Sequence, residues 1–220
     1  MTTPIKIDFV SDVACPWCAV GLKSLEEAMS RVGGDLQVEL HFQPFELNPQ
    51  MPAEGEDAVE HLTRKYGISA EQAAQNGEAI RARGAALGFE FRMDRRRHVY
   101  NTFDAHRLLH WAGLEGPQQQ LALKHALLRA YFTEGEDVSS TDILAKLAVE
   151  AGLDDARARQ ILATGEFAGD VRQQQSFYAS QGITAVPSVI FNDRHLIQGG
   201  QPVELFEQAL RQLSGIPASD

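Results

Sequence analysis

The chain contains 220 residues, of which 44% are hydrophobic and 23% are charged, and its formal net charge is −10. This length suffices for one large or two small domains with a sizeable buried core. The negative charge argues against a nucleic-acid partner, which would require a basic face. No apolar run approaches the ~20 residues that cross a bilayer, so we expect no membrane partner either.

The first residues lead directly into a predicted strand and lack the basic, apolar and cleavage regions of a secretory signal. If the chain is complete, this predicts a cytoplasmic protein, although a mature form that had lost its signal peptide would look the same. In the cytoplasm structural disulfides are rare, and a single pair of cysteines is more often catalytic or redox-sensing. The sequence leaves the oligomeric state open.

Residues 5 to 32 predict a strand followed at once by a helix. Apolar residues dominate positions 5 to 10, a polar break follows, and leucine, methionine and valine then recur at three- and four-residue steps. The two cysteines of the chain, Cys15 and Cys18, stand between these patterns and are separated by Pro16 and Trp17. Cys15 is therefore expected at the start of the helix, with Cys18 one turn further in.

The expected position of Cys15 favours a reactive thiolate. Free N–H groups and the dipole of a helix start stabilise negative charge, so the pKa of Cys15 should lie below the ~8.5 of a free thiol. Pro16 suits the first helical turn because it has no N–H to lose. Cys18 can then close and reopen a disulfide with Cys15 through a mixed disulfide. We expect the Cys15 sulfur to be accessible to solvent.

Other interpretations of the cysteine pair are half of a zinc site and two cysteines packed at a helix start. Zinc usually takes two Cys/His pairs, and no second pair lies close by in the sequence, so we prefer a redox pair and expect no metal. A cysteine-protease site is disfavoured because no positioned histidine is evident for Cys18.

Beyond a glycine stop at positions 33 and 34, residues 36 to 42 alternate apolar and polar side chains and predict a second strand. A strand–helix–strand unit of this length predicts parallel strands with a right-handed crossover. Three prolines mark a boundary between residues 44 and 55, after which helical periodicity dominates. Capping boxes are expected at Ser69 and Ser139. The predicted helices of this middle segment span residues 69–88, 101–112, 117–132, 139–152, 154–162 and 166–180.

From residue 183 the pattern returns to extended structure. Residues 188–191 and 195–197 predict an antiparallel hairpin around an Asn-Asp turn, and a last helix should begin at Pro202. Neither end of the chain can bury a sheet by itself, so one sheet should combine both ends. The expected fold class is α/β. Residues 1–50 and 165–220 are expected to form one discontinuous domain, and residues 51–164 an inserted helical domain.

The order of these elements resembles that of thioredoxin, a mixed sheet flanked by helices, here with a large all-helical insertion. The chain is most similar to the FrnE-type branch of the DsbA-like thioredoxin family, and the resemblance covers nearly its whole length. The motifs that carry it are FVSDVACPWC at 9–18, AHRL at 105–108, AYFTEGEDVSS at 130–140, GITAVP at 182–187 and GGQP at 199–202.

This resemblance implies a thiol–disulfide oxidoreductase or isomerase acting on protein or small-molecule substrates, in which Cys15 attacks and Cys18 resolves. It implies a cis peptide bond at Pro187 facing the cysteines, the alternative being a trans proline at a strand start. Val186 would offer backbone groups to an extended peptide. Trp17 would form an apolar platform beside the sulfurs, unless it serves packing alone.

No cofactor is implied beyond a redox-active disulfide, with glutathione as a candidate reductant or co-substrate. Pro16, Phe45 and His106 are further candidates for the substrate cleft, although His106 and its neighbour Arg107 can equally serve a core or inter-helix role. The basic run at residues 92–97 is expected to form a solvated face.

The same superfamily contains kappa-class glutathione transferases and 2-hydroxychromene-2-carboxylate isomerases, which typically carry a serine at the reactive position and bind glutathione. Cys15, Cys18 and the pair Gln201-Pro202 depart from that pattern and favour redox chemistry. A glutathione-dependent isomerase or transferase and a non-enzymatic redox-sensing module are the two alternatives.

Overall fold

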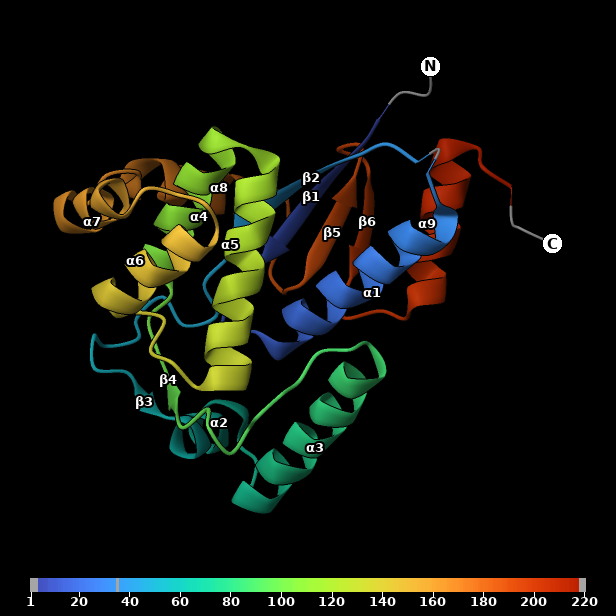
Figure 1. Ribbon diagram of the computed structural model, residues 1–220. Coiled ribbons are helices and arrows are strands. Elements are labelled where there is room, and N and C mark those ends of the chain that lie inside the picture. Colours follow the sequence, from blue (N-terminus) through green and yellow to red (C-terminus); the bar gives the residue numbers. More distant parts are fainter. Residues whose placement is uncertain (1–3, 35, 218–220) are drawn as a thin grey trace.

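A four-stranded sheet built from both ends of the chain forms the centre of the molecule (Figure 1). The computed structural model describes residues 4–34 and 36–217. β1 runs parallel to β2 and antiparallel to β5, and β5 and β6 form an antiparallel hairpin, so the mixed sheet expected from the sequence is confirmed. In spatial order the strands are β2 (Val38–Pro44), β1 (Ile5–Ser11), β5 (Ser188–Phe191) and β6 (His195–Gln198).

Alternation along β1 assigns the two faces of the sheet. Phe9 points toward helix α1 (Pro16–Val32), where its ring lies 3.7 Å from the Cβ position of Gly21. Helix α9 (Val203–Ser214) packs beside α1 on this face (Figure 1). Val10 points the opposite way and packs against Tyr178 of helix α8 (Ala168–Ser180). The central strand is thus covered on both sides, as its near-continuous burial requires.

The other helices follow one another between β2 and α8. None of the helices in the described ranges is long and apolar enough to cross a membrane. Helices α4 to α7 gather beside the β2 edge of the sheet (Figure 1). They are α4 (Phe103–Glu115), α5 (Pro117–Arg129), a π-helical turn (Ala130–Glu134), α6 (Thr141–Glu150) and α7 (Asp155–Thr164).

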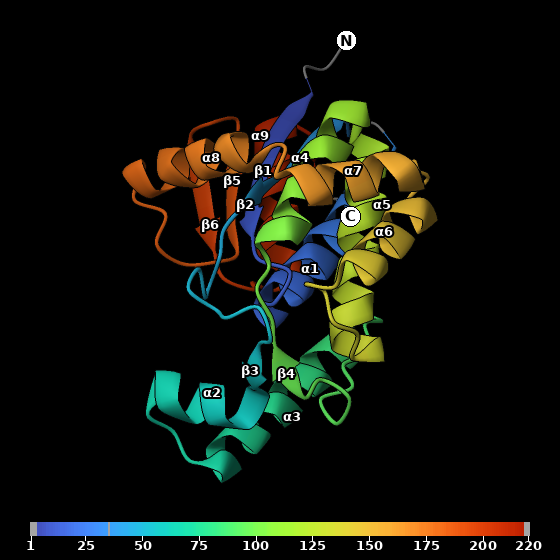
Figure 2. The same cartoon turned by 90° about the vertical axis from the view of Figure 1, so that its left-hand side faces the viewer.

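Two further helices, α2 (Ala58–Tyr66) and α3 (Ala70–Ala86), form an arm that projects away from the sheet (Figures 1 and 2). A two-residue ladder of β3 (Glu56–Asp57) with β4 (His98–Val99) closes the base of the arm. The sequence did not predict α2 or this ladder. Helix α2 is short, and its two buried residues, Ala58 and His61, include a polar one, so the sequence offers few apolar positions by which to recognise it.

The structure confirms one of the two predicted capping boxes. Ser69 accepts a hydrogen bond from the Gln72 N–H, and the Gln72 side chain accepts one from the Ser69 N–H. The box at Ser139 is wrong, because Ser140 is the N-cap of α6 and makes no side-chain cap hydrogen bond. Ser139 instead donates from its N–H and hydroxyl to the Asp137 carboxylate, which forms a local turn that competes with capping.

Gln120 of α5 joins the helical segment to the sheet. Its side-chain amide accepts a hydrogen bond from the Phe42 N–H at 3.0 Å and donates to the Phe42 carbonyl at 3.2 Å. The same amide nitrogen donates to the Leu109 carbonyl of α4 at 3.1 Å. Gln120 therefore satisfies the outward-facing backbone groups of an edge strand, a place normally filled by another strand.

We expect Gln120→Ala to lower the free energy of unfolding by about 2 kcal/mol, because it leaves buried backbone groups of Phe42 without partners. Urea unfolding followed by circular dichroism measures this change. Gln118→Ala, at an exposed position of the same helix, is the matched control and should leave stability almost unchanged. Equal losses in the two variants would contradict the proposed coupling.

Candidate active site

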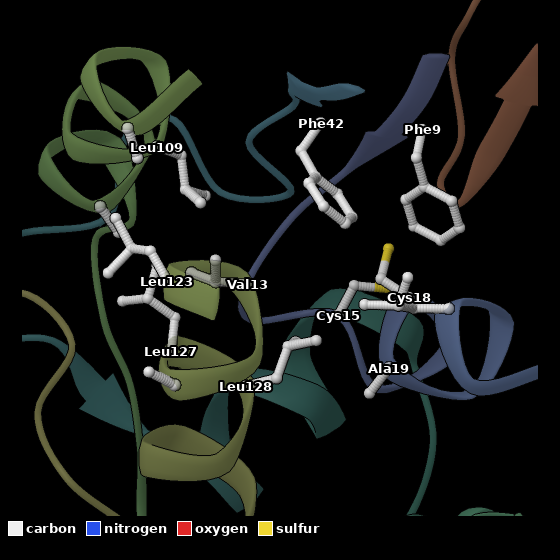
Figure 3. Close-up of a cluster of buried hydrophobic side chains, with 14 of the residues drawn as sticks. Phe9, Val13, Cys15, Cys18, Ala19, Phe42, Leu109, Leu123, Leu127 and Leu128 are labelled. Atoms are coloured by element: carbon white, nitrogen blue, oxygen red, sulfur yellow. The ribbon is translucent and has the colours of Figure 1, made fainter. Parts of the chain in front are cut away.

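The first cysteine lies at the junction of strand and helix that the sequence predicts. Helix α1 begins at Pro16, and Cys15 is its N-cap, with the extended backbone angles typical of that position. The Cys18 N–H donates to the Cys15 carbonyl at 3.0 Å, which closes the first turn. Both cysteines are free thiols, and Figure 3 shows them close together.

The two sulfur-bearing residues are more buried than expected. Cys15 is 4% exposed and Cys18 is 0% exposed, so the expectation of a freely accessible Cys15 sulfur is wrong. Figure 3 shows the rings of Phe9 and Phe42 on one side of the pair and Leu128 of α5 on the other. Helix α5 thus buries the cysteines further than the sheet and helix α1 alone would. Cys15 remains the cysteine with some exposed surface.

The surroundings push the pKa values of the two thiols in opposite directions. The Cys18 thiol, hydrogen-bonded to the Cys15 sulfur, lowers the pKa of Cys15. The backbone N–H groups of Cys18 and Trp17 at the helix start act in the same direction, while burial and the Asp12 carboxylate oppose them. Burial raises the pKa of Cys18 well above its ordinary value, and the neighbouring Cys15 adds to this effect.

The segment before β5 lies against the cysteine pair. The Val186–Pro187 peptide bond is cis, as the family resemblance implies, and the Cys15 sulfur lies 3.8 Å from the Val186 carbonyl oxygen. Helix α1 approaches this segment closely, since a Cβ added at Gly21 would lie 3.0 Å from the Pro187 ring. A side chain at position 21 would therefore push Pro187 away from the helix that carries both sulfurs.

Trp17 presents an exposed apolar surface beside the cysteines. Its side chain is 41% exposed, and its ring packs against the Gly199-Gly200 loop, where a Cβ at Gly200 would lie 3.0 Å from the indole. The structure therefore holds the indole on one side and leaves the rest of it open to a partner. Pro16 is half-buried at the first position of α1.

Asp12 is a buried residue of the site that the sequence did not single out. It is 1% exposed, and its carboxylate accepts hydrogen bonds from the backbone N–H groups of Ala14 at 3.2 Å and Leu47 at 2.7 Å. Its spacing three residues before Cys15, in a polar break before a helix, is the signal that could have identified it. Asp12 fixes the turn that presents Cys15.

Of the remaining candidate cleft residues, His106 is buried and Phe45 is half-buried. His106 is 2% exposed, and its Nε2 atom lies 3.5 Å from an Asp12 carboxylate oxygen. Phe45 is half-buried and packs against the cluster of Val10, Tyr178 and Ile183, which Val186 also contacts. Arg107 donates from its guanidinium to the Ile161 carbonyl, so it serves an inter-helix role.

Within residues 4–34 and 36–217, no group of three or more His, Cys, Asp or Glu side chains is placed to hold a metal ion. The basic run at residues 92–97 is partly neutralised, because Arg92 pairs with Asp94. Arg96 stacks over the Tyr131 ring at 5.4 Å.

Comparison with known proteins places these features in a family context. A model of the family described as "DSBA-like thioredoxin domain" matches residues 6–211. The uncharacterised protein YwbO of Bacillus subtilis is 32% identical over 213 residues, which cover 96% of each chain.

Two solved structures are similar to this chain over nearly its whole length. The crystal structure of a probable DsbA oxidoreductase from Streptomyces coelicolor is 36% identical, with a TM-score of 0.89, over 98% of this chain and 92% of that chain. A putative protein disulfide isomerase from Nitrosomonas europaea is 23% identical, with a TM-score of 0.70, over 96% of each chain, and shows the shared fold.

Proposed function

The chain belongs to the DSBA-like thioredoxin domain family of disulfide oxidoreductases and isomerases, and from this premise we propose that Cys15 and Cys18 form its redox-active pair. The observation that carries the proposal is that two sulfurs one helical turn apart have pKa values shifted in opposite directions. The pKa of Cys15 is lowered, whereas that of Cys18 is raised by burial. Paired groups whose environments push their pKa values apart take different chemical roles.

In the proposed reaction the Cys15 thiolate attacks one sulfur of a substrate disulfide. A bond forms between Cys15 and that sulfur, and the other substrate sulfur leaves as a thiolate. Cys18 then loses its proton and attacks the Cys15 sulfur, which releases the second substrate sulfur and leaves a Cys15–Cys18 disulfide. Two molecules of glutathione would return this disulfide to the dithiol and leave as glutathione disulfide. The reverse sequence would oxidise a substrate dithiol.

Trp17, Val186 and Pro187 are the proposed contacts for the substrate, a protein or small-molecule thiol or disulfide. The indole of Trp17 is 41% exposed beside the sulfurs and suits an apolar side chain of the substrate. Val186 presents its backbone next to the Cys15 sulfur, where an extended peptide could pair with it as an added strand.

Three further assignments are proposals. The motifs around the cysteines and at residues 130–140 support the FrnE-type branch. Two cysteines in 220 residues support a cytoplasmic location, where thiols stay reduced. The sheet that joins both ends of the chain supports a thioredoxin-like domain of residues 1–50 and 165–220, with residues 51–164 inserted.

The titration of Cys15 tests the proposed role directly. In the reduced parent protein, the ultraviolet absorbance of the first thiolate to form, that of Cys15, should appear with a midpoint below that of a free cysteine. Because the pKa of Cys15 is lowered, alkylation by a small reagent should stay fast at neutral pH and slow as the pH falls through that midpoint. Cys18→Ala removes the group that lowers the pKa of Cys15 most, so the Cys15 midpoint should rise in that variant. A first midpoint at or above that of free cysteine in the parent protein would contradict the assignment of Cys15 as nucleophile.

A further inference from the structure

Helix α5 places a lysine on its buried face, which points toward the cysteines. Leu128 of α5 lies beside the cysteine pair in Figure 3, and Lys124 precedes it by four residues, which puts both on one side of the helix. Lys124 is 0% exposed, and its Nζ atom has no hydrogen-bond partner among the described residues. A buried ammonium without a partner is costly, so packing alone does not explain it.

The charges around Lys124 belong to the candidate active site. Burial lowers the pKa of Lys124, and Cys18, Asp12 and Cys15 oppose this effect in that order of size. Lys124 in turn acts on Cys18 against the effect of burial. Its Nζ atom also lies 5.6 Å from the centre of the Phe42 ring, and Figure 3 shows this ring above the sulfurs. The lysine thus lies next to a ring that packs on the cysteine pair.

A cavity of about 160 Å³ leads from the protein surface to this lysine, between β2 and helices α4, α5 and α8. Lys124 and His106 are its buried lining residues with ionisable side chains. His41, His110 and Gln174 line its half-exposed part. None of the described residues that line it carries a carboxylate, although the protein has a net charge of −10.

The floor of the cavity also reaches the turn before Cys15. His106 Nε2 has no hydrogen-bond partner in the described ranges and lies 3.5 Å from Asp12, which is buried. Two nitrogens without hydrogen-bond partners, Lys124 Nζ and His106 Nε2, therefore line the buried part of one cavity. Burial raises the pKa of the Cys18 thiol, which keeps this sulfur protonated. The resolving step of the proposed function needs that sulfur as a thiolate, and its proton needs a way out.

Resting on the redox pair proposed above, we propose that Lys124 is the electrostatic partner of the Cys18 sulfur and that the cavity beside it is the path by which the Cys18 proton reaches solvent. In the resolving step the Cys18 S–H bond breaks and its proton leaves through the cavity. The positive charge of Lys124 stabilises the thiolate that remains. The thiolate attacks Cys15, the bond between Cys15 and the substrate sulfur breaks, and the substrate leaves with the electron pair.

The test separates the two thiol steps in one experiment. Reduced protein is mixed with excess symmetrical aromatic disulfide, and release of the coloured aromatic thiolate is followed in time. Attack by Cys15 releases one equivalent, and resolution by Cys18 releases a second. Lys124→Met should slow the second release by about tenfold at neutral pH and leave the first unchanged. The deficit should shrink as the pH rises, because hydroxide then removes the Cys18 proton.

Two controls accompany this variant. Lys23→Met removes a lysine from α1 that is partly exposed and paired with Glu26, and it should change neither phase. Cys18→Ser should abolish the second phase, which identifies it. Since methionine removes a buried unpaired charge, Lys124→Met should also unfold at a higher urea concentration than the parent protein.

An unchanged second phase in Lys124→Met would overturn the inference. Equal slowing of both phases together with a lower urea midpoint would also overturn it, because the lysine would then be a packing residue. A parent protein that releases no thiolate in the first phase would contradict the proposed function itself, which keeps the two failures distinct.

Discussion

Cys15→Ser is expected to reduce disulfide exchange to the uncatalysed rate, the largest effect of any single substitution proposed for this protein. The Cys15 sulfur lies at the N-cap of α1, where the helix start and Cys18 lower its pKa. A serine hydroxyl at the same place stays protonated and cannot form a disulfide. Reduction of insulin disulfides with glutathione as reductant, and isomerisation of a scrambled disulfide protein, measure the loss.

The serine variant should unfold at nearly the same urea concentration as the reduced parent, since serine and cysteine are of similar size. A folded Cys15→Ser protein that keeps its activity would contradict the proposed function. Such a result, joined to tight glutathione binding by calorimetry, would favour a glutathione-dependent isomerase or transferase instead. If Cys15→Ser lost both its activity and its fold, Cys15→Ala would separate the two effects, because alanine places no hydroxyl at this buried position that needs a hydrogen-bond partner.

Cys18→Ser is expected to stop the reaction halfway and accumulate protein covalently joined to its substrate. Cys15 can still attack, but Cys18 is the thiol positioned one turn behind it to displace the bound sulfur. Incubation with a substrate disulfide should give a one-to-one adduct that appears by mass spectrometry and is released by a strong reductant. Turnover should fall to the rate at which external thiols displace the adduct.

The double variant Cys15→Ser/Cys18→Ser should form no adduct, which shows that the trapped sulfur is that of Cys15. If Cys15→Ser formed the adduct as fast as Cys18→Ser does, the assignment of Cys15 as the nucleophile and Cys18 as the resolving thiol would be wrong. Cys18 is 0% exposed, so such a result would also require local opening of the structure around it.

The sequence predicted the frame of the molecule because that frame depends on local signals. Apolar positions at 5 to 10, two cysteines and Pro16 placed a strand and a helix start where β1 and α1 lie. Residues 36–42 predicted a strand whose observed bounds are Val38–Pro44, and the parallel pairing with β1 is confirmed. Asn192 and Asp193 predicted the hairpin turn, and both adopt the positive φ angles that such a turn requires.

What the sequence could not show depends on contacts between segments far apart in the chain. Leu128 covers the cysteine pair from a helix more than a hundred residues away, so the burial of Cys15 was underestimated. Asp12 gained its importance through the distant Leu47 N–H. Lys124 is visible in the sequence as a charged residue among the leucines of α5, but the charges that act on it in the fold include Cys18, which lies far away in the chain.

The amide of Gln120 has a consequence for how the molecule meets copies of itself. A sheet edge with free N–H and C=O groups is a template for another strand, and proteins with bare edges are prone to associate through them. On the β2 side, Gln120 occupies the backbone of Phe42, and helices α4 and α5 cover the strand. Edge-to-edge addition, whether of a second molecule or of an unfolded chain, should therefore favour β6, at the opposite border of the sheet, over the part of β2 around Phe42.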